Sequence, residues 1–594
     1  MQPPGLKSPS TPNHFVYRLE PSLLFMIQKI KPNLVLTVGV ATLLVGGGIA
    51  AYYGLVSRKF LEGVPLGANV VPQEAMVAVS LSTNPQQWDK LSQYGTVQSQ
   101  AALQDILKNW QNRVFTDNGY NYQQDIQPWV GQEVMIASLP NSSLISGTAP
   151  NSDTSTSLNQ QTMVVVLPIA NPTKAKELLS RPRTLQQGQT TQRSYRGVDI
   201  IETQGNPKQN YSISVLGQDF LVVTTDPNAT ERVIDTYRGS DSLAKTPGYA
   251  ANLETIKTTN PFAQVYLNIP VATKIASYRS PNPIPDKNLE QVQQHQGLAT
   301  NISLESQGVG FKGVSWLKPN SQKKFTVENK AQEILPRIPE NTLMMVSGSN
   351  LKRVWEDYTQ GANANPIAPL NPQVLSSSFK SATGMELEKD VLNWMGGEFS
   401  LSLVPANPNP RALERFTAGL VLMVKVSDRT VADKALTQLD EVMKNKKFKV
   451  SEIKVKEQSA VQWVSPFGGF MVTRGWLESD VAFVTLGGAV ADQIVPLPQA
   501  QITANPLFQQ TVPMGLNPNN GNFFINLERV FNPNVRTLSL PQLPPGQKLW
   551  IDAIQSIGLT TAIISDRTSR YDIFVKIKTP STQLPATATP KKEP

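Results

Sequence analysis

The chain has 594 residues, of which 40% are hydrophobic and 17% charged, enough apolar material for several packed domains. It contains no cysteine, which excludes a disulfide framework, thiolate catalysis, iron–sulfur clusters and cysteine-ligated zinc. Two histidines, His14 and His295, leave little for imidazole chemistry. The net charge of +9 comes from 54 basic and 45 acidic residues, which suits an anionic surface but is far from a nucleic-acid footprint.

The first predicted element is a transmembrane helix at Leu34–Val56, an uncharged apolar run long enough to cross a bilayer of about 30 Å. Lys29 and Lys31 precede it and Arg58 and Lys59 follow it, so the count of positive charges, with Arg18, only modestly favours a cytoplasmic N-terminus. In that orientation the remainder of the chain is extracytoplasmic, in a periplasm or a thylakoid lumen.

A cleaved signal peptide is the alternative, because a basic segment and an apolar run counted from Met26 lead to a small-residue site at Gly48–Ala50. Whether the segment is a membrane anchor or a cleaved signal peptide, the rest of the chain is expected to be exported. Gly46, Ala50 and Gly54 form a small-residue ladder through which an uncleaved helix can form a homodimer, although small residues are also common in membrane helices generally.

A long internal repeat follows the membrane segment. The segment 71–88 aligns without gaps onto 338–355, pairing Trp88 with Trp355 at an offset of 267. The segment 125–140 aligns onto 390–405 at an offset of 265. This period is far too long for a solenoid, so it indicates a tandem duplication.

Within each copy the apolar periodicity predicts mixed α and β structure, and the hairpins favour an α+β fold with a mostly antiparallel sheet. In chain order, the first copy has predicted strands at 75–81, 134–139, 162–169, 211–216, 220–225, 263–269, 298–304 and 308–317, with helices at 85–94, 98–114, from Asn171-Pro172 and at 226–237. The second copy has predicted strands at 419–426, 471–476, 481–486, 559–564 and 570–578 and a helix at 430–444.

The predicted organisation has a membrane segment and two tandem homologous α+β domains with mostly antiparallel sheets. Polar inserts at 141–160 and 406–411 are expected to be surface loops. The full order is a cytoplasmic segment (1–33), a transmembrane helix or signal peptide (34–56), a linker (57–70), a first repeat domain (71–325), a second repeat domain (326–578) and a disordered tail (579–594).

The opening "VP..A" strand, the element "PWVGQE" and its copy "NWMGGE", behind one N-terminal membrane helix, resemble a bacterial, mainly cyanobacterial, membrane-anchored family known as domain of unknown function 3352. The resemblance covers about residues 71–578. It implies an envelope or thylakoid location but no activity, cofactor or site residues.

The repeated Trp-Gly-Glu elements are the best candidates for a site. An exposed tryptophan beside a glycine turn can stack on a sugar or grip a partner, with the glutamate supplying charge. The structural alternative, which we favour, makes the tryptophan a core anchor, the glycine a backbone turn and the glutamate a cap. The residues concerned are Trp129, Gly131 and Glu133 in the first copy and Trp394, Gly396 and Glu398 in the second.

No catalytic constellation is evident. Asp125 and Glu133 have the residue types of a glycosidase pair, but such pairs are uninformative without their separation. Nucleophile elbows, phosphate loops, zinc motifs and calcium loops are missing from the sequence. The Ser-x-x-Lys pattern recurs, for example at Ser242/Lys245, Ser321/Lys324 and Ser451/Lys454, without its companion motifs. His295 lies in a polar stretch expected to be an exposed helix. We therefore predict no enzyme activity, no cofactor and no metal site.

The strongest run of positive charge is Lys444, Lys446, Lys447 and Lys449, followed by Lys454 and Lys456. It could contact anionic lipid headgroups. Intervening glutamates favour a solvated helix end followed by a lysine-bearing edge strand. Nucleic acid is not expected to bind, because the segment lies outside the cytosol and lacks interleaved aromatic residues.

The function predicted from the sequence is non-catalytic binding. The leading hypothesis is an envelope or thylakoid scaffold with a protein partner. The second is a carrier or chaperone that holds a lipid, a pigment or an unfolded chain in a groove, and the third is a hydrolase.

Overall fold

The computed structural model describes residues 61, 63–114, 121–140, 162–180, 189–204, 211–279, 289–290, 292–362, 371–406, 417–466, 471–487, 489–531 and 545–578. Within these ranges, no helix has the length and apolar character needed to cross a bilayer. The predicted membrane segment, the insert at 141–160, most of the insert at 406–411 and the C-terminal tail lie outside them.

Among the described residues, the first half has ten strands, interspersed with helices. They follow in the order η1 (Leu66–Asn69), β1 (Val77–Ser82), α3 (Pro85–Ser92), α4 (Val97–Val114), η3 (Tyr122–Ile126), β2 (Glu133–Leu139), β3 (Thr162–Pro168), α6 (Pro172–Ser180), β4 (Gln189–Tyr195), β5 (Val198–Gln204), β6 (Ser212–Leu216), β7 (Phe220–Thr224), α7 (Pro227–Tyr237), η5 (Leu243–Lys245), α8 (Tyr249–Thr255), β8 (Ala263–Asn268), α9 (Ile269–Arg279), β9 (His295–Glu305) and β10 (Gly308–Leu317).

The second half repeats the ten strands. Its elements are η6 (Leu335–Arg337), β11 (Met344–Gly348), α11 (Leu351–Ala362), α12 (Pro372–Thr383), η7 (Leu387–Val391), η8 (Leu392–Trp394), β12 (Phe399–Pro405), β13 (Ala418–Lys425), α13 (Arg429–Asn445), β14 (Lys449–Val455), β15 (Gln458–Val464), β16 (Met471–Trp476), β17 (Val481–Gly487), α14 (Ala491–Ile494), η9 (Ile502–Ala504), α15 (Pro506–Thr511), β18 (Gly521–Asn526), α16 (Leu527–Val530), α17 (Pro545–Ala553), β19 (Ile554–Ser565) and β20 (Thr568–Ile577).

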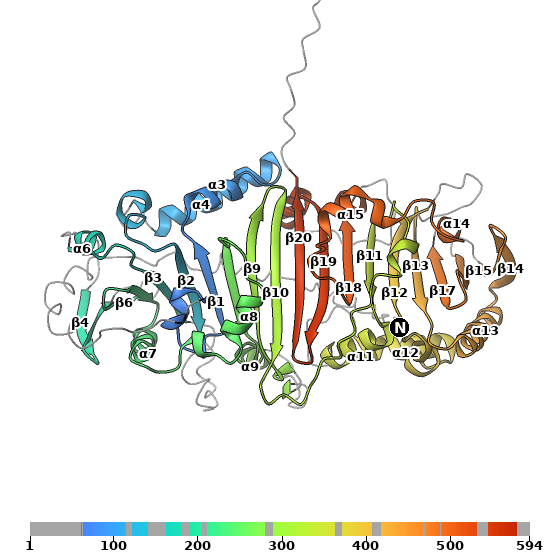
Figure 1. The fold of residues 1–594 in the computed structure, drawn as a ribbon, viewed down its shortest axis with the longest axis horizontal. Coiled ribbons are helices and arrows are strands. Elements are labelled where there is room, and N and C mark those ends of the chain that lie inside the picture. Colours follow the sequence, from blue (N-terminus) through green and yellow to red (C-terminus); the bar gives the residue numbers. More distant parts are fainter. Residues whose placement is uncertain are drawn as a thin grey trace, which may run out of the picture.

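All twenty described strands join one antiparallel sheet, seen face-on in Figure 1. The pairing within the first half recurs within the second, with each strand number raised by ten. The mixed α+β class is thus confirmed. The spatial order is β4-β5-β6-β7-β3-β2-β1-β8-β9-β10-β20-β19-β18-β11-β12-β13-β17-β16-β15-β14.

The two halves meet at a seam between β10 and β20, which pair from Gly308 opposite Lys576 to Trp316 opposite Thr568. Lys312 faces Asp572 in the middle of the seam. These two residues are equivalent in the repeat, because each is the fifth residue of its strand, so the halves are related by a local two-fold axis at this pair.

The expectation of a separate sheet in each domain was wrong, because one sheet runs through both halves. A last strand left unpaired would expose a row of backbone N–H and C=O groups. Pairing β10 with β20 satisfies these groups in both halves at once. Within the described residues, only β4 and β14 remain as edges of the sheet.

One face of the sheet, here called the first face, carries the two main cores. In the first half, α7, α8, η1 and η5 pack on it around residues such as Val166 and Val222, which are inaccessible to solvent. In the second half, α14, α15 and η9 pack around residues such as Met423 and Phe524. Burial of about 25 cal/mol per Å² of apolar area makes these clusters the main stabilising contacts of the fold.

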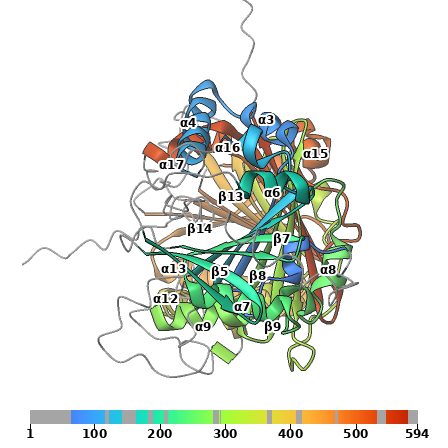
Figure 2. The same ribbon diagram turned by 90° about the vertical axis from the view of Figure 1, so that its left-hand side faces the viewer.

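The opposite face, here called the second face, has helices near its ends and margins. One cluster joins α4 and α6 to β3 and β7, and the other joins α11, α12 and α13 to β12, β13 and β17. In the side view of Figure 2, α4 and α17 lie along one margin of this face and α12 and α13 along the other, while α8 and α15 lie on the opposite side of the sheet.

Several helices begin with an Asx-Pro pair, as the sequence predicts for 171–172 and 226–227. The Asp226 carboxylate accepts a hydrogen bond from the N–H of Asn228, and the amide oxygen of Asn371 accepts from Gln373 and Val374. An Asx oxygen satisfies a free N–H of the first turn, and the proline lacks an N–H that would need a partner.

His295 corrects one expectation. It lies at the start of β9 rather than in an exposed helix, its Nδ1 is 3.3 Å from Ser315 Oγ, and its ring lies 5.9 Å from that of Phe325. Burial, with a smaller effect from nearby Lys323, lowers the pKa of His295 to about 4. A register shift between Trp316 and Leu317 extends the β9–β10 pairing to this residue, which periodicity alone does not reveal.

Candidate functional site

The two repeated tryptophans lie in the protein core. Trp129 lies between η3 and β2, is 1% exposed, and donates from Nε1 to the carbonyl oxygen of Asp125 at 2.6 Å. Trp394 ends η8 and is 2% exposed, but its Nε1 has no acceptor among the described residues. At these exposures neither indole offers a free face for stacking on a sugar. Their surroundings are those of core anchors.

The glycines of these elements allow the chain to pass close to a neighbouring strand. The Gly131 N–H donates to the carbonyl oxygen of Pro168 at 2.8 Å, and a Cβ at Gly131 would lie 3.1 Å from Pro168 Cβ. In the second half the tight contact falls on Gly397, where a Cβ would lie 2.3 Å from the carbonyl oxygen of Lys425. A Cβ at Gly396 would meet nothing closer than 3.7 Å.

The two glutamates cap equivalent turns on the first face. Glu133 accepts from the N–H of Leu66 at 2.6 Å and from Ser80 Oγ at 2.5 Å, which fixes the start of η1. Glu398 accepts from the N–H of Glu333 at 3.1 Å and from that of Ile334 at 3.0 Å, just before η6. These bonds satisfy backbone groups that would otherwise lack partners.

Glu398 is the more deeply buried of the two glutamates, at 6% exposed. Burial, opposed by the two backbone N–H groups, raises the pKa of Glu398 to about 7. A raised carboxyl pKa is typical of catalytic sites but also of buried caps. The hydrogen bonds found here run to backbone groups, and the described residues contain no cluster of three or more metal-ligating side chains.

The lysine cluster lies at the end of α13 and the start of edge strand β14. Lys444 pairs with Glu441 at 2.6 Å. Lys446, Lys447 and Lys449 are exposed, and no carboxylate of the described residues lies within ion-pair distance of them. The cluster is therefore a solvated basic corner at one end of the sheet.

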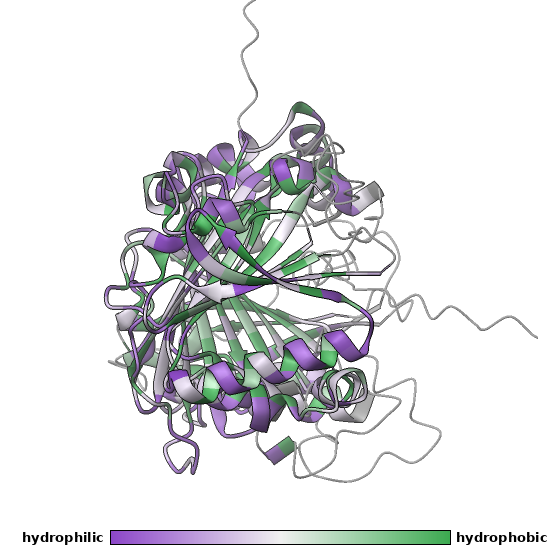
Figure 3. Cartoon of the chain, turned by 90° about the vertical axis from the view of Figure 1, so that its right-hand side faces the viewer, coloured by the Kyte–Doolittle hydropathy of each residue, from purple (hydrophilic) through white to green (hydrophobic). Residues whose placement is uncertain are grey.

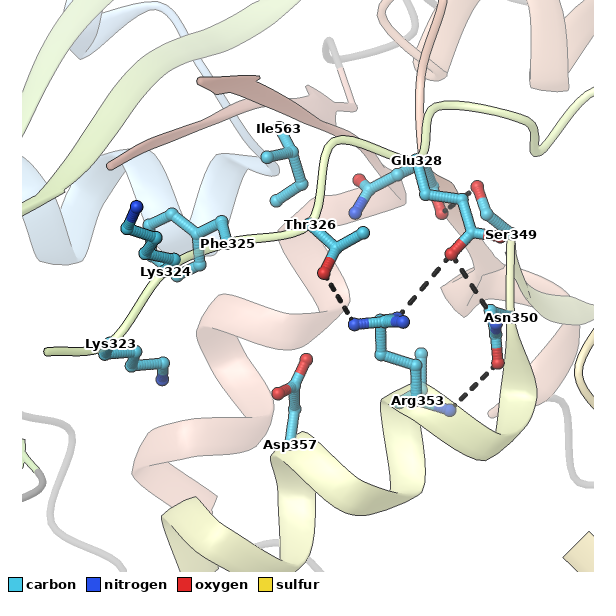
Figure 4. A pocket seen from close by; sticks show the side chains of 12 residues that line it. Lys323, Lys324, Phe325, Thr326, Glu328, Ser349, Asn350, Arg353, Asp357 and Ile563 are labelled. Atoms are coloured by element: carbon cyan, nitrogen blue, oxygen red, sulfur yellow. Dashed lines mark hydrogen bonds and ion pairs between the residues drawn. The ribbon is translucent and has the colours of Figure 1, made fainter. Parts of the chain in front are cut away.

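A small pocket lies where the linker between the halves passes α11 (Figure 4). Arg353 crosses it, donating to Thr326 Oγ1 at 2.7 Å and pairing with Glu328 at 3.6 Å. Its volume of about 90 Å³ is room for roughly three waters, whereas sites for organic ligands usually exceed roughly 300 Å³. This pocket is therefore smaller than an organic ligand usually needs, and Arg353 links α11 to the segment between the halves across it.

Sequence reasoning missed a band of apolar side chains on the second face of the sheet. We call it the apolar floor, and it consists of two rows in which residues on neighbouring strands lie directly opposite each other. The first row is Leu401, Val346, Phe523, Leu559, Ile573, Phe311 and Ile302. The second is Leu420, Leu403, Met344, Ile525, Ile557, Val575, Val309 and Leu304.

The floor spans the seam and uses strands of both halves. Val346 and Leu401, opposite each other on β11 and β12, are each 38% exposed, and the rest of the floor is half-buried. On the first face, by contrast, the neighbouring Met345 and Phe524 are completely buried. Figure 3 shows hydrophobic colouring along the strands between the two helix margins.

Two sets of helices partly cover the floor. Among the described residues, α9 packs on β8 and β9 at one margin, and α16 and α17 pack on β19 at the other. A sheet face turned to water normally carries polar side chains, whereas none of the floor side chains has an N–H, O–H or carboxylate group. The sequence signal was present in apolar runs such as 419–424, which indicate strands buried on both faces.

The fold and the floor define a class of two-half α+β proteins with one continuous antiparallel sheet. The chain belongs to the family described as "Protein of unknown function (DUF3352)", whose family model matches residues 37–577. The resemblance deduced from the Trp-Gly elements is thus confirmed.

Comparison with solved structures finds crystal forms III and IV of TP0453. Form III is 9% identical, with 42% of this chain and 80% of that chain covered, at a TM-score of 0.24. Form IV is 10% identical, with 42% and 81% covered, at 0.23. No curated protein matches the chain significantly.

Proposed function

We propose that this chain is a membrane-anchored, exported, non-catalytic binding protein that holds an apolar partner on the floor of its sheet. The observation that carries the proposal is the pair of half-buried to exposed apolar rows, which cross the seam without a polar side chain. An apolar surface of this extent on a sheet is stable when something apolar covers it.

The anchor part of the proposal is supported by the uncharged run Leu34–Val56, which is long enough to cross a bilayer. The proposal puts the residues after it outside the cytosol. The location is then a periplasm or a thylakoid lumen. Protease added to intact spheroplasts should digest residues 71–578 of a periplasmic chain and leave a small membrane-embedded N-terminal fragment. In sealed thylakoid vesicles, a lumenal chain should be protected until the vesicles are opened.

The binding part is tested by releasing the full chain from native membranes with mild detergent and determining the size and composition of what comes with it. A Val346→Asp variant places a charge at the exposed part of the floor and should lose the partner. Val431→Asp is the matched control, because Val431 is similarly exposed, at 42%, but lies on α13 away from the floor. Equal retention of the partner by both variants would contradict the proposal.

A further inference from the structure

We propose that the basic corner, defined as Lys446, Lys447 and Lys449, binds the anionic lipid headgroups of the membrane that carries the anchor, so that the long axis of the sheet lies along this membrane. The inference rests on the anchor of the proposed function and does not depend on the floor. The segment 444–456 carries six lysines and one glutamate, a net charge of +5, whereas the whole chain carries +9. More than half of the excess positive charge is thus gathered at one corner.

The fold itself does not require these charges, because the equivalent edge strand lacks them. β4 ends the sheet in the first half as β14 does in the second. The one cation of β4, Arg193, pairs with Glu202 and Glu231, both at 2.5 Å. Within the described residues, an exposed group of lysines without carboxylate partners at an edge strand is therefore a feature of the second half alone. Edge protection is achieved on β4 without it.

The end of α13 brings the three lysines together on the surface. Lys446 is the C-cap of the helix, and Lys447 has a φ of 68°, which turns the chain before Lys449 begins β14. All three side chains are exposed. A helix C-terminus favours cations close to it, which accounts for Lys446 but not for Lys449 in the strand. Three exposed ammonium groups within four residues can meet a flat anionic surface together.

The anchor determines which anionic surface is close. The five residue steps from Val56 to Leu61 span at most about 18 Å, so an anchor that ends at Val56 holds the start of the described chain near the membrane. η1 follows and packs on β2 and β3. β14 lies fourteen strands beyond β2, which is about 65 Å at roughly 4.8 Å per strand.

Contacts at these two places would hold the sheet along the membrane rather than upright on it. Figure 1 shows β14 at the right-hand end of the long axis and β2 on the other side of the seam. Each lysine near an anionic bilayer strengthens binding by about five-fold, so three lysines give about 100-fold. This is enough for a chain that the anchor already keeps at high effective concentration. Single-stranded nucleic acid fits less well, because Phe448, the aromatic residue among the lysines, is half-buried.

The test uses the full chain reconstituted in phosphatidylcholine vesicles with or without phosphatidylglycerol. Because the chain has no cysteine, Asn445→Cys provides one position for a fluorescent label at the corner, and Ser194→Cys provides the matched position on β4. A phosphatidylcholine with a nitroxide on its headgroup should quench the label at 445 at least five-fold more when phosphatidylglycerol is present. High salt should abolish this difference, and quenching at 194 should not depend on phosphatidylglycerol.

Variants of the labelled chain test whether the lysines carry the contact. Replacing all three lysines of the corner by Gln should reduce the quenching at 445 at least five-fold. The matched control removes the same charge from three exposed lysines of α4 and α6 and should leave the quenching unchanged, and its positions are Lys108, Lys174 and Lys176. Circular dichroism identifies any variant that fails to fold.

Extraction of the vesicles with alkaline carbonate separates the two proposals. A chain that stays in the vesicles with no quenching at 445 overturns the inference and leaves the anchor standing. A chain that carbonate removes overturns the anchor and the inference with it. Quenching that is equal without phosphatidylglycerol, or that survives the three Gln replacements, overturns the inference. Absence of quenching together with a cross-link from 445 to an acidic protein in native membranes overturns it in favour of a protein partner.

Discussion

The two equivalent core tryptophans differ in one hydrogen bond, and that difference makes a sharp prediction. Trp129→Phe removes a bond from Nε1 to the Asp125 carbonyl oxygen at 2.6 Å. Trp394→Phe removes an N–H that has no acceptor among the described residues. Both side chains are almost fully buried, at 1% and 2% exposed, so the loss of apolar contact is nearly the same in the two variants.

The hydrogen bond lost in Trp129→Phe is worth about 1 kcal/mol. The buried N–H removed in Trp394→Phe costs the native protein about 1–3 kcal/mol in desolvation, which the variant recovers. We therefore expect Trp129→Phe to lower the free energy of unfolding by at least about 2 kcal/mol more than Trp394→Phe. For one half of the chain, this difference in the free energy of unfolding corresponds to a difference of roughly 4–8 °C in melting temperature.

The assay is calorimetry of the full chain in detergent micelles, with urea unfolding followed by far-ultraviolet circular dichroism as a second measurement. Trp88→Phe is a second comparison, because Trp88 Nε1 also donates to a carbonyl oxygen, that of Ser82 at 2.8 Å, but Trp88 is half-buried, so its replacement should cost less than that of Trp129. Equal melting temperatures for Trp129→Phe and Trp394→Phe, or a lower one for Trp394→Phe, would refute the reasoning.

Four further predictions follow from buried groups. The pKa of His295 is lowered to about 4, so the unfolded chain binds a proton at this residue more tightly than the folded chain does. The free energy of unfolding, measured by urea titration, should therefore fall as the pH drops from about 6.5 to 4, and His295→Gln should abolish this loss. The pKa of Glu398 is raised to about 7, so stability should instead fall as pH rises from about 4.5 to 7, and Glu398→Gln should remove that slope. Asp440→Ala leaves the buried Arg474 guanidinium without its carboxylate partner and should lower the free energy of unfolding by about 3–5 kcal/mol. Replacing Asp440 and Arg474 together by apolar residues should cost far less. Gly313→Val places a Cβ within 1.9 Å of the aromatic ring opposite it on β20, and calorimetry should show the seam weakened by about 1–3 kcal/mol.

Much of the fold follows from local sequence signals. The tryptophan-containing repeats predicted two halves with equivalent strands, and the Asx-Pro pairs predicted the helix starts at residues 172 and 227. The β4–β5 hairpin escaped prediction because its sequence is mostly polar, as befits a strand pair at the edge of a sheet. The turn between these strands, at Arg196 and Gly197, takes positive φ at both residues.

The candidate residues were found by repetition, and repetition is equally a property of packing. Trp129 and Trp394 recur because each anchors an equivalent core cluster, and Glu133 and Glu398 recur because each caps an equivalent turn. A duplicated fold must solve the same packing problem twice. Residues that recur in both halves of one chain therefore identify structural positions more readily than binding sites, because a binding site is needed on one surface only.

The apolar floor was hidden from sequence reasoning for a different physical reason. The floor strands at the seam alternate apolar floor residues with polar first-face residues such as Lys312 and Asp572, so the pattern of each strand shows one apolar face without showing what covers it. Only the pairing of β10 with β20 places Phe311 opposite Ile573 and joins the rows of two halves that are far apart in the chain. The continuous surface belongs to the seam and not to either repeat, which is why a duplication can create an apolar face that neither copy possesses alone.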